Sequence, residues 1–268
     1  MAKKIGNRFR IPIDFELLND IGPYHQASLD DKLEIKLTFN DKKAIILGST
    51  PALAAADDAD YDYFVTDIKT EWEEITSPSL ASLMSSIYQN GLALPYTRVF
   101  EHRFMTIKKS DPVVNLSINT PSKSISKFLI LAIDPDDRKQ FAHTEKFKNI
   151  NITKVNIGIE GVKNINALYA LGMQTHNTYD QILKVFKGNG VSLRDFLTEK
   201  YELCFDLRPS IDDALHGNGA YLQNTSEGVT LEIHRVAEAG SGKLNLHMFV
   251  FQDAQLNIAG RRFHSIEA

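Results

Sequence analysis

The stretch GVTLEIHRVAEAGSGKLNLHMFVFQDAQLNIAGRRF, residues 228–263, decides the fold class of this chain. Apolar residues alternate with polar ones on both sides of the glycine-rich turn at 240–242. Alternation of period two around such a turn predicts an antiparallel hairpin with one buried face. The second arm runs from Leu244 to Ile258, well beyond the roughly five or six residues of an average strand. A long, late strand of this kind is typical of the central strand of an all-β domain.

The composition is that of an ordinary globular protein. Of the 268 residues, 43% are hydrophobic and 24% are charged, and the formal net charge is −4. This apolar content can fill a sizeable core, and the negative charge argues against a whole-chain electrostatic grip on nucleic acid or an anionic membrane. The single cysteine, Cys204, excludes an intrachain disulfide framework and fits a reducing compartment. Because its neighbours Leu203 and Phe205 are apolar, we expect a buried, inert thiol.

The first ten residues, MAKKIGNRFR, form a basic amino-terminal arm. No apolar segment follows the four basic side chains, so the arm does not match a secretory signal, and we expect a protein that is not secreted. Such an arm is typical of a solubilising tail, with contact to nucleic acid or to the inside of a shell as the alternative. The longest apolar run, 128–133, is far shorter than the ~20 residues that cross a bilayer. We therefore expect no membrane span.

Alternating apolar residues predict further strands along the whole chain. The cleanest is at 33–39, where Leu33, Ile35, Leu37 and Phe39 share one face. The others are expected at 10–18, 44–47, 97–107, 113–119, 125–133, 152–160 and 201–207. Between them, Phe64, Ile68 and Trp72 lie on one face of the segment 63–76, which we expect to be a core face.

Helices are predicted only in connections between strands. Ser77 is a suitable N-cap, Pro78 suits the first turn, and Gly91 follows the last apolar residue of the stripe. Residues 164–200 break the strand pattern, and Ser192 with Asp195 makes an S-x-x-D helix start. We interpret this region as a helical insertion at about 161–200, because it has too few apolar residues for a core of its own.

The arrangement of these elements predicts an all-β fold. Strands and helices do not alternate along the chain as they would in a doubly wound parallel sheet. The sequence also lacks the fixed-period repeat of a propeller or solenoid. The pattern favours an antiparallel jelly-roll sandwich with short helices inserted in the connections. We expect a single jelly-roll domain over residues 11–268 behind the basic arm at 1–10.

No catalytic, cofactor-binding or metal-binding residues are predicted, and we expect the chain not to be an enzyme. The eight histidines are not at ligand spacing, and neither H-E-x-x-H nor G-x-S-x-G occurs. His234 and His247 lie in the two facing arms of the predicted hairpin, where they could be neighbours. Two histidines without a third ligand are a weak indication of a metal site. The glycine stretches at 217–219 and 239–243 do not open helices and therefore do not predict phosphate loops.

Two acidic loops, 57–62 and 134–137, offer oxygen atoms that Ca²⁺ prefers. Neither has the glycine and the closing glutamate of an EF-hand loop. We favour solvated loops over cation sites at both places.

Several stretches, in this order, resemble one family of viral proteins. They are 15–20 (FELLND), 23–27 (PYHQA), 37–41 (LTFND), 152–155 (ITKV), 159–162 (IEGV), 169–173 (YALGM), 212–219 (DDALHGNG), 224–231 (NTSEGVTL) and 253–258 (DAQLNI). Together they are similar to the carboxy-terminal part of the major capsid (hexon) proteins of Polinton/Maverick elements, adintoviruses and Polinton-like viruses. The resemblance extends from about Arg10 over nearly the whole chain.

The resemblance implies a structural role in a virion. Such proteins carry two jelly rolls in one chain, and three chains form a pseudo-hexagonal capsomer of an icosahedral shell. Two rolls need sixteen strands, and with about eleven predicted strands this chain corresponds to one roll, the second. This is the form expected of a truncated or domesticated copy, or of a chain whose first roll is supplied elsewhere. The implied partners are further copies of itself, as homotrimers and in the capsid lattice, and other capsid subunits such as the penton protein. The implied location is the virion capsid, and the host nucleus or cytoplasm during assembly.

Three alternatives remain open from the sequence. A single roll also suits a penton-like or minor capsid component. A jelly roll also suits a ligand-binding module of the carbohydrate type, which would show clustered surface aromatics. A cupin-like enzyme would need inward-facing histidines and a carboxylate at close spacing, which the sequence does not show.

Overall fold

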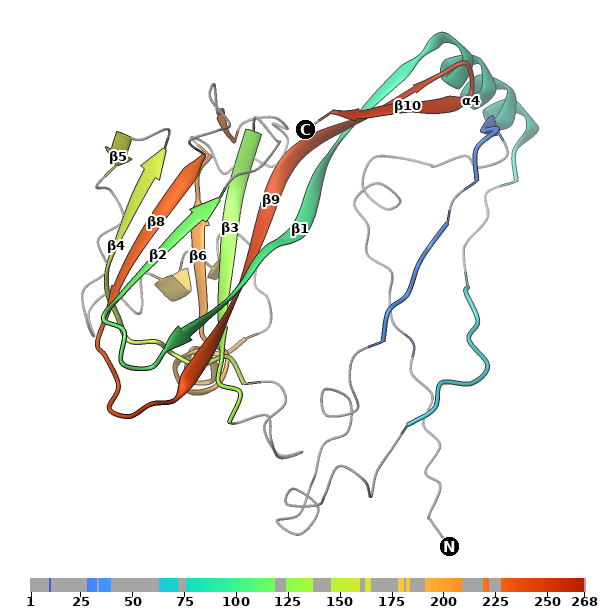
Figure 1. Ribbon diagram of the computed structural model, residues 1–268. Coiled ribbons are helices and arrows are strands. Elements are labelled where there is room, and N and C mark those ends of the chain that lie inside the picture. The colour runs from blue at the N-terminus through green and yellow to red at the C-terminus, as the bar shows by residue number, and fades with distance from the viewer. Residues whose placement is uncertain are drawn as a thin grey trace, which may run out of the picture. The chain divides into compact units, whose positions relative to one another are not determined.

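Figure 1 shows the computed structural model, which describes the following part of the chain. The described residues are 10, 28–32, 34–39, 63–71, 76–118, 124–136, 146–159, 162–164, 178–180, 182–183, 191–208, 219–221 and 228–267. The chain divides into two compact units. The helix unit comprises Met1–Leu33, Ser77–Tyr96 and Gln255–Ile266, and the roll unit comprises Glu34–Thr76, Thr97–Ala254 and Glu267–Ala268.

Two antiparallel sheets carry the fold. The first has the strand order β1 (Leu92–Lys108), β9 (Lys243–Ala259), β3 (Ser124–Ile133), β6 (Glu202–Asp206). The second has the order β2 (Val113–Ile118), β8 (Val229–Arg235), β4 (Ile152–Ile159), β5 (Val162–Asn164). The short strands β7 (Ala220–Tyr221) and β10 (Arg262–Glu267) pair with β3 and β9.

These eight main strands have jelly-roll connectivity. Along the chain β1, β2, β3 and β4 alternate between the sheets, β5 stays beside β4, and β6, β8 and β9 alternate again. Two four-stranded sheets wound in this way are the eight-stranded double Greek key of a jelly roll. The predicted all-β, antiparallel jelly-roll sandwich is therefore confirmed.

The predicted hairpin at 228–263 is wrong in its pairing. Both arms are strands, β8 and β9, but β8 pairs with β2 and β4 in one sheet, whereas β9 lies between β1 and β3 in the other. The glycine turn, where Gly240 has φ 113°, carries the chain from one sheet to the other. Because the two strands bury their apolar faces in the same core from opposite sides, their alternation looks like that of a hairpin.

The core of the roll unit lies between the two sheets. The inward positions of β3 and β9 are paired across the ladder, with Phe128 opposite Val250 and Ile130 opposite Met248. All four side chains are buried, and they face buried residues of β2, β4 and β8 such as Ile233. Each such side chain stabilises the fold by about 1.5–3 kcal/mol through its removal from water.

The helix unit is built around α4 (Pro78–Asn90). Its predicted caps are confirmed, since the Ser77 hydroxyl accepts from the Leu80 N–H at 3.4 Å and the Gly91 N–H donates to the Ile87 carbonyl at 3.0 Å. Gly91 has φ 113°, a conformation that favours glycine. The buried ring of Tyr88 packs with apolar residues of β9 in a small core of this unit.

The second predicted helix is also confirmed. α6 (Leu193–Thr198) begins after Ser192, whose hydroxyl accepts from the Asp195 N–H at 3.1 Å. Phe196 is buried between the rings of Tyr179 and Tyr201, at centroid distances of 5.3 and 5.0 Å. Residues 178–180 and 182–183 are also helical, so helices do lie in the connection between β5 and β6.

Five of the predicted strands are confirmed as β1, β2, β3, β4 and β6. The predicted strand at 33–39 is wrong for its described part, because residues 34–39 form no strand. The predicted core face at 63–76 is wrong for Phe64 and Ile68, which are 80% and 60% exposed. Alternation specifies a strand only where a neighbouring strand completes its hydrogen bonds. The predicted strands at 11–18 and 44–47, the acidic loop 57–62 and Trp72 lie outside the described residues.

Candidate functional site

A cluster of charged side chains in the roll unit lies where connections between its described strands meet. It contains Lys109 from the β1–β2 turn, Asp134 after β3, Lys148 before β4, Arg235 at the end of β8 and Glu238 after it. Backbone hydrogen bonds join these connections, with the Lys109 N–H donating to the Gly242 carbonyl at 2.8 Å. We call these five residues the charged cluster.

The charged cluster is a continuous chain of ion pairs. Lys109 Nζ lies 2.5 Å and Lys148 Nζ 3.1 Å from Asp134 Oδ2. Lys148 Nζ also lies 2.8 Å from Glu238 Oε2, and Glu238 Oε1 lies 3.2 Å from Arg235 Nη2. The Arg235 side chain is fully buried, and its Nε donates to the Ile150 carbonyl at 3.2 Å. The cluster thereby ties connections of both sheets together.

Their surroundings shift the pKa values of Asp134, Lys148 and Arg235 in the charged cluster. Burial by itself raises the pKa of the Asp134 carboxyl, but the hydrogen bonds from Lys109, the Asp136 N–H and Lys148 outweigh burial and lower it. Burial by itself lowers the pKa of Lys148, but the hydrogen bonds to Glu238 and Asp134 outweigh burial and raise it. Burial lowers the pKa of the Arg235 guanidinium, against the attraction of Glu238. The carboxylates and lysines thus stabilise each other's charged forms.

The sequence favours a solvated loop after β3, but Asp134 of this loop is buried. The Asp134 side chain is only 5% exposed, and Lys109 and Lys148 already occupy its carboxylate. Two ammonium groups at this distance disfavour a divalent cation by like-charge repulsion. Asp136 is more exposed, and Asp137 lies outside the described residues.

A shallow polar groove lies on the outer face of the second sheet. The registers place Asn115, Glu232 and Asn156 in one row across β2, β8 and β4. Thr230 and Gly158 belong to the next row, and the groove has a volume of about 330 Å³. Its described lining combines hydrogen-bonding side chains with Leu116, Leu231 and Gly158, and it includes no aromatic ring. Groups of this kind bind water or polar ligands through hydrogen bonds, and they contain no arrangement of nucleophile and base.

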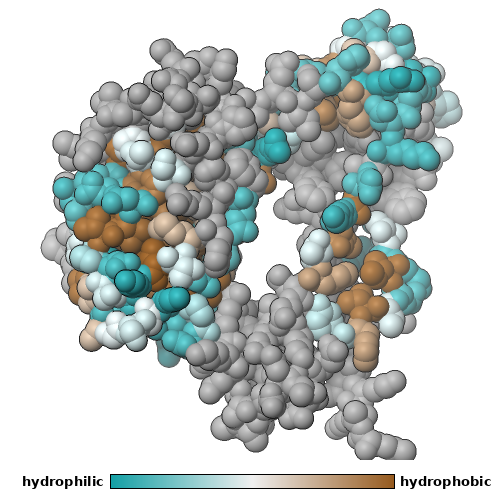
Figure 2. All heavy atoms as spheres, viewed as in Figure 1, coloured by the Kyte–Doolittle hydropathy of each residue, from teal (hydrophilic) through white to brown (hydrophobic). Residues whose placement is uncertain are grey.

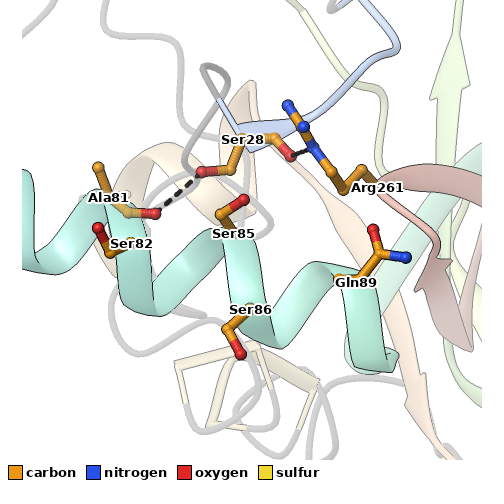
Figure 3. Close-up of a pocket in the computed structure, with 7 residues that line it drawn as sticks. All are labelled: Ser28, Ala81, Ser82, Ser85, Ser86, Gln89 and Arg261. Carbon is orange, nitrogen blue, oxygen red and sulfur yellow. Dashed lines mark hydrogen bonds between the residues drawn. The ribbon is translucent and has the colours of Figure 1, made fainter.

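A larger hollow, of about 610 Å³, lies beside α4 in the helix unit (Figure 3). Its lining is formed by Ser28, Ala81, Ser82, Ser85, Ser86, Gln89 and Arg261. Ser28 connects two of its walls, since its hydroxyl donates to the Ala81 carbonyl at 3.3 Å and its own carbonyl accepts from Arg261 Nε at 3.0 Å. Arg261 also forms an ion pair with Asp30 at 3.4 Å. The hydroxyls have no general base among the lining residues, so the hollow does not indicate catalysis.

The expected proximity of His234 and His247 is wrong. His234 lies on the second sheet with Nε2 at 2.6 Å from Glu232 Oε1, whereas His247 lies on the first sheet with Nδ1 at 2.6 Å from Glu101 Oε1. Within the described part of the chain, no three potential ligand side chains gather for a metal ion. The described helices also include none that is long and apolar enough to span a membrane.

Cys204 is buried as expected, and burial raises the pKa of its thiol to about 12. A thiol with this pKa is almost entirely protonated at neutral pH and is a poor nucleophile.

Gly219, in one of the two glycine stretches, has a packing role. It lies against β3, where an added Cβ would be 2.6 Å from the Ile125 carbonyl group. Its N–H donates to Asp253 Oδ2 at 2.9 Å, and the Ser124 hydroxyl donates to the same oxygen at 2.5 Å. The glycine is needed for close approach of two backbones, as glycine commonly is.

Sequence reasoning missed the charged cluster, whose members are separated by up to 129 positions (238 minus 109). The apolar run before Asp134 was visible, but no motif marks its two lysine partners. Only the connectivity of the roll brings these side chains together.

Comparison with known proteins gives matches only among solved structures. No protein-family model matches the chain, and no curated protein matches it significantly. The PBCV-1 virus capsid matches at 10% identity and TM-score 0.44, over 68% of this chain and 52% of that one. The Faustovirus major capsid protein matches at 9% and 0.41, over 69% and 36%, and the mavirus major capsid protein at 9% and 0.36, over 66% and 41%. This chain thus spans about half or less of each of these proteins.

Proposed function

We propose that this chain is a structural, hexon-like capsid protein that self-associates as trimers to build an icosahedral shell. The observation that carries the proposal is where the virus-like sequence motifs fall in the fold. The motif at 152–155 opens β4, the motif at 224–231 leads into β8, and the motif at 253–258 lies in β9. These three stretches thus belong to strands of a jelly roll, the fold that the resemblance implies.

The surface chemistry of the roll suits assembly better than catalysis. The connections around the charged cluster are held by ion pairs and backbone hydrogen bonds instead of presenting a nucleophile with a base. Rigid connections are an advantage for subunit contacts, because little conformational entropy is lost on association. The proposed partners are further copies, a first jelly roll and penton-type subunits, with no specific nucleic acid and no cofactor. The proposed location is the virion, with assembly in the host nucleus or cytoplasm.

Size-exclusion chromatography with light scattering, followed by negative-stain microscopy, tests the proposal. We expect a trimer or shell-like particles from the purified chain, with subunit contacts well above ~1,000 Å² as stable interfaces require. Pentamers would instead assign the chain to the penton-like or minor capsid role. A well-folded monomer at high concentration, alone and with a chain that carries the first roll, would contradict the capsid function.

The polar groove on the second sheet is the observation that favours a second candidate, a carbohydrate-type binding module. Asn115, Asn156 and Glu232 present amide and carboxylate groups of the kind that hydrogen-bond to sugar hydroxyls. A glycan array with the wild type and the variant Asn156→Ala tests this alternative. Binding that the substitution abolishes would support it, and a blank array together with trimers would exclude it.

A further inference from the structure

The exposed side of α4 carries no charged residue. Residues 75–97, which include the whole helix, are the longest stretch of the chain without a charged side chain, although 24% of all residues are charged. From the second residue of the helix onward, the exposed positions of α4 are Ser79, Ser82, Leu83, Ser86, Gln89 and Asn90. We call these six residues, which the helical period places on one side, the α4 face. A helix face that meets only water is normally rich in charged side chains, so this composition indicates a contact surface.

Leu83 supplies an apolar group in the α4 face. Its side chain is 56% exposed, whereas Met84 and Tyr88 on the other side of the helix belong to the small core of the helix unit. Figure 2 shows hydrophobic atoms among hydrophilic ones at the surface where Figure 1 labels α4. Burial of such a leucine in a contact stabilises association, because apolar surface is removed from water.

The polar groups of the α4 face can pair with copies of themselves. Ser82, Ser86 and Gln89 also line the hollow beside α4 (Figure 3), and their side chains form no hydrogen bond within the described part of the chain. A hydroxyl or a carboxamide can both donate and accept hydrogen bonds, whereas a carboxylate only accepts and an ammonium only donates. Two identical faces of hydroxyls and amides can therefore bond to each other without repulsion between like charges.

We propose that the α4 face is a symmetric contact surface, on which the α4 face of a second copy packs across a two-fold axis. This inference rests on the self-association proposed above and identifies one surface that makes it. A two-fold contact brings each residue near the axis opposite the same residue of the partner, so any charge there would meet its own sign. A charge-free face of self-complementary groups is the composition that such a contact requires. This requirement is what selects a second copy as the partner.

The size of the α4 face gives the contact its place in the assembly. The helix has 13 residues and is therefore ~20 Å long. Two helices of this length bury less surface than the ~1,200 Å² at which specific, stable interfaces begin. The contact therefore acts together with the contacts of the proposed trimer, as a link between one trimer and the next.

The first experiment places charges of either sign on the α4 face. The variants are Ser86→Glu and Ser86→Lys, with Ser241→Glu and Ser241→Lys as matched controls at an exposed serine of the β8–β9 connection. Circular dichroism with a thermal melt verifies each fold, and light scattering over a concentration series measures assembly. Each Ser86 variant alone should form trimers but link them at least ~10-fold more weakly, because identical charges oppose each other across the axis. An equimolar mixture of the two Ser86 variants should regain the linkage, and the controls should assemble like the wild type.

The second experiment detects the contact directly. Ser82→Cys and Ser86→Cys are each treated with a short bismaleimide, with Ser241→Cys as the control. Because each variant has one surface cysteine and the native Cys204 is buried, a crosslink joins two copies and cannot form within one. We expect covalent dimers from the α4 variants and none from the control at the same concentration. The absence of dimers from both α4 variants at every concentration up to the solubility limit would overturn the inference.

The outcomes separate this inference from the proposed function. If Ser86→Glu links trimers as well as the wild type does, the α4 contact is wrong and the capsid function stands. If both charged variants fail and their mixture also fails, α4 contacts a different surface, and the two-fold contact is wrong. If the wild type stays monomeric at all concentrations, with and without a chain that carries the first roll, both proposals fail.

Discussion

Replacing Asp134 by Asn tests the charged cluster with little change of shape. The amide keeps an oxygen that accepts from the Asp136 N–H, a hydrogen bond of 3.1 Å in the wild type. What is lost is the negative charge that lies 2.5 Å from Lys109 Nζ and 3.1 Å from Lys148 Nζ. The change therefore removes the central anion of the cluster and leaves Lys109 without its closest counter-charge.

The structure sets the expected magnitude. Removal of one partner from a buried ion pair destabilises proteins by ~3–5 kcal/mol. Here the value is lower, because the side chains of Lys109 and Lys148 are 15% and 28% exposed and Lys148 keeps Glu238 at 2.8 Å. We expect the free energy of unfolding to fall by ~2–3 kcal/mol after this discount. At roughly 2–4 °C per kcal/mol, Tm should fall by about 5–10 °C.

The loss should depend on pH with a definite sign. The pKa of Asp134 in the folded chain is lowered, whereas in the unfolded chain it is near ~3.9. A carboxyl with a lowered folded pKa contributes its stabilisation above the unfolded pKa, and this is lost as pH falls through the folded pKa. The difference in unfolding free energy between the wild type and Asp134→Asn should therefore be largest near neutral pH. It should shrink below about pH 4.

Urea unfolding followed by circular dichroism, repeated from pH 7 down to pH 3, measures both effects. The control is Asp136→Asn, two positions away, whose carboxylate is 56% exposed and 3.8 Å from Lys109 Nζ. We expect the control to change stability by less than ~0.5 kcal/mol. The reasoning is refuted if Asp134→Asn is no less stable than this control, or if its deficit is the same at pH 3 as at pH 7.

Three further predictions concern the core and its close contacts. Phe128→Ala, at a fully buried position of β3, should lower the unfolding free energy by ~3–5 kcal/mol in urea titrations, and a loss below ~1 would place Phe128 outside the core. Gly219→Ala should cost ~1–3 kcal/mol by the same measurement, because its Cβ would meet the Ile125 carbonyl carbon at 2.6 Å; an unchanged midpoint would contradict this contact. Cys204, whose pKa burial raises to about 12, should not react with a thiol reagent at pH 8 until urea unfolds the chain, and fast labelling of the native protein would refute its burial.

Local signals in the sequence identified much of the secondary structure. Helix α4 begins at the predicted cap Ser77 and ends before Gly91, and α6 begins after Ser192. These boundaries were readable because a cap depends on side chains within three or four residues of each other. The strands of the core were readable as well, because burial of one face imposes an alternation of period two.

The candidate site was not readable in the same way. In the sequence, Asp134 stands out only as part of an acidic run. No local sequence pattern indicates that Lys109, Lys148 and Arg235 belong to the same cluster. An ion pair between residues far apart in the chain has no local signature, since its members are brought together by the connections of the fold. The polar groove on the second sheet likewise exists only once β2, β8 and β4 are aligned in register.

By itself, the sequence determined which segments are extended, where two helices begin, and that the strands bury one face in an antiparallel β fold. Only the tertiary structure decided that β8 and β9 belong to opposite sheets, that Asp134 is an ion-paired buried group, and that residues 34–39 form no strand. The physical reason is that alternation records the burial of a face but not the neighbour that buries it. Sheet membership depends instead on hydrogen bonds between distant strands, which the global topology selects.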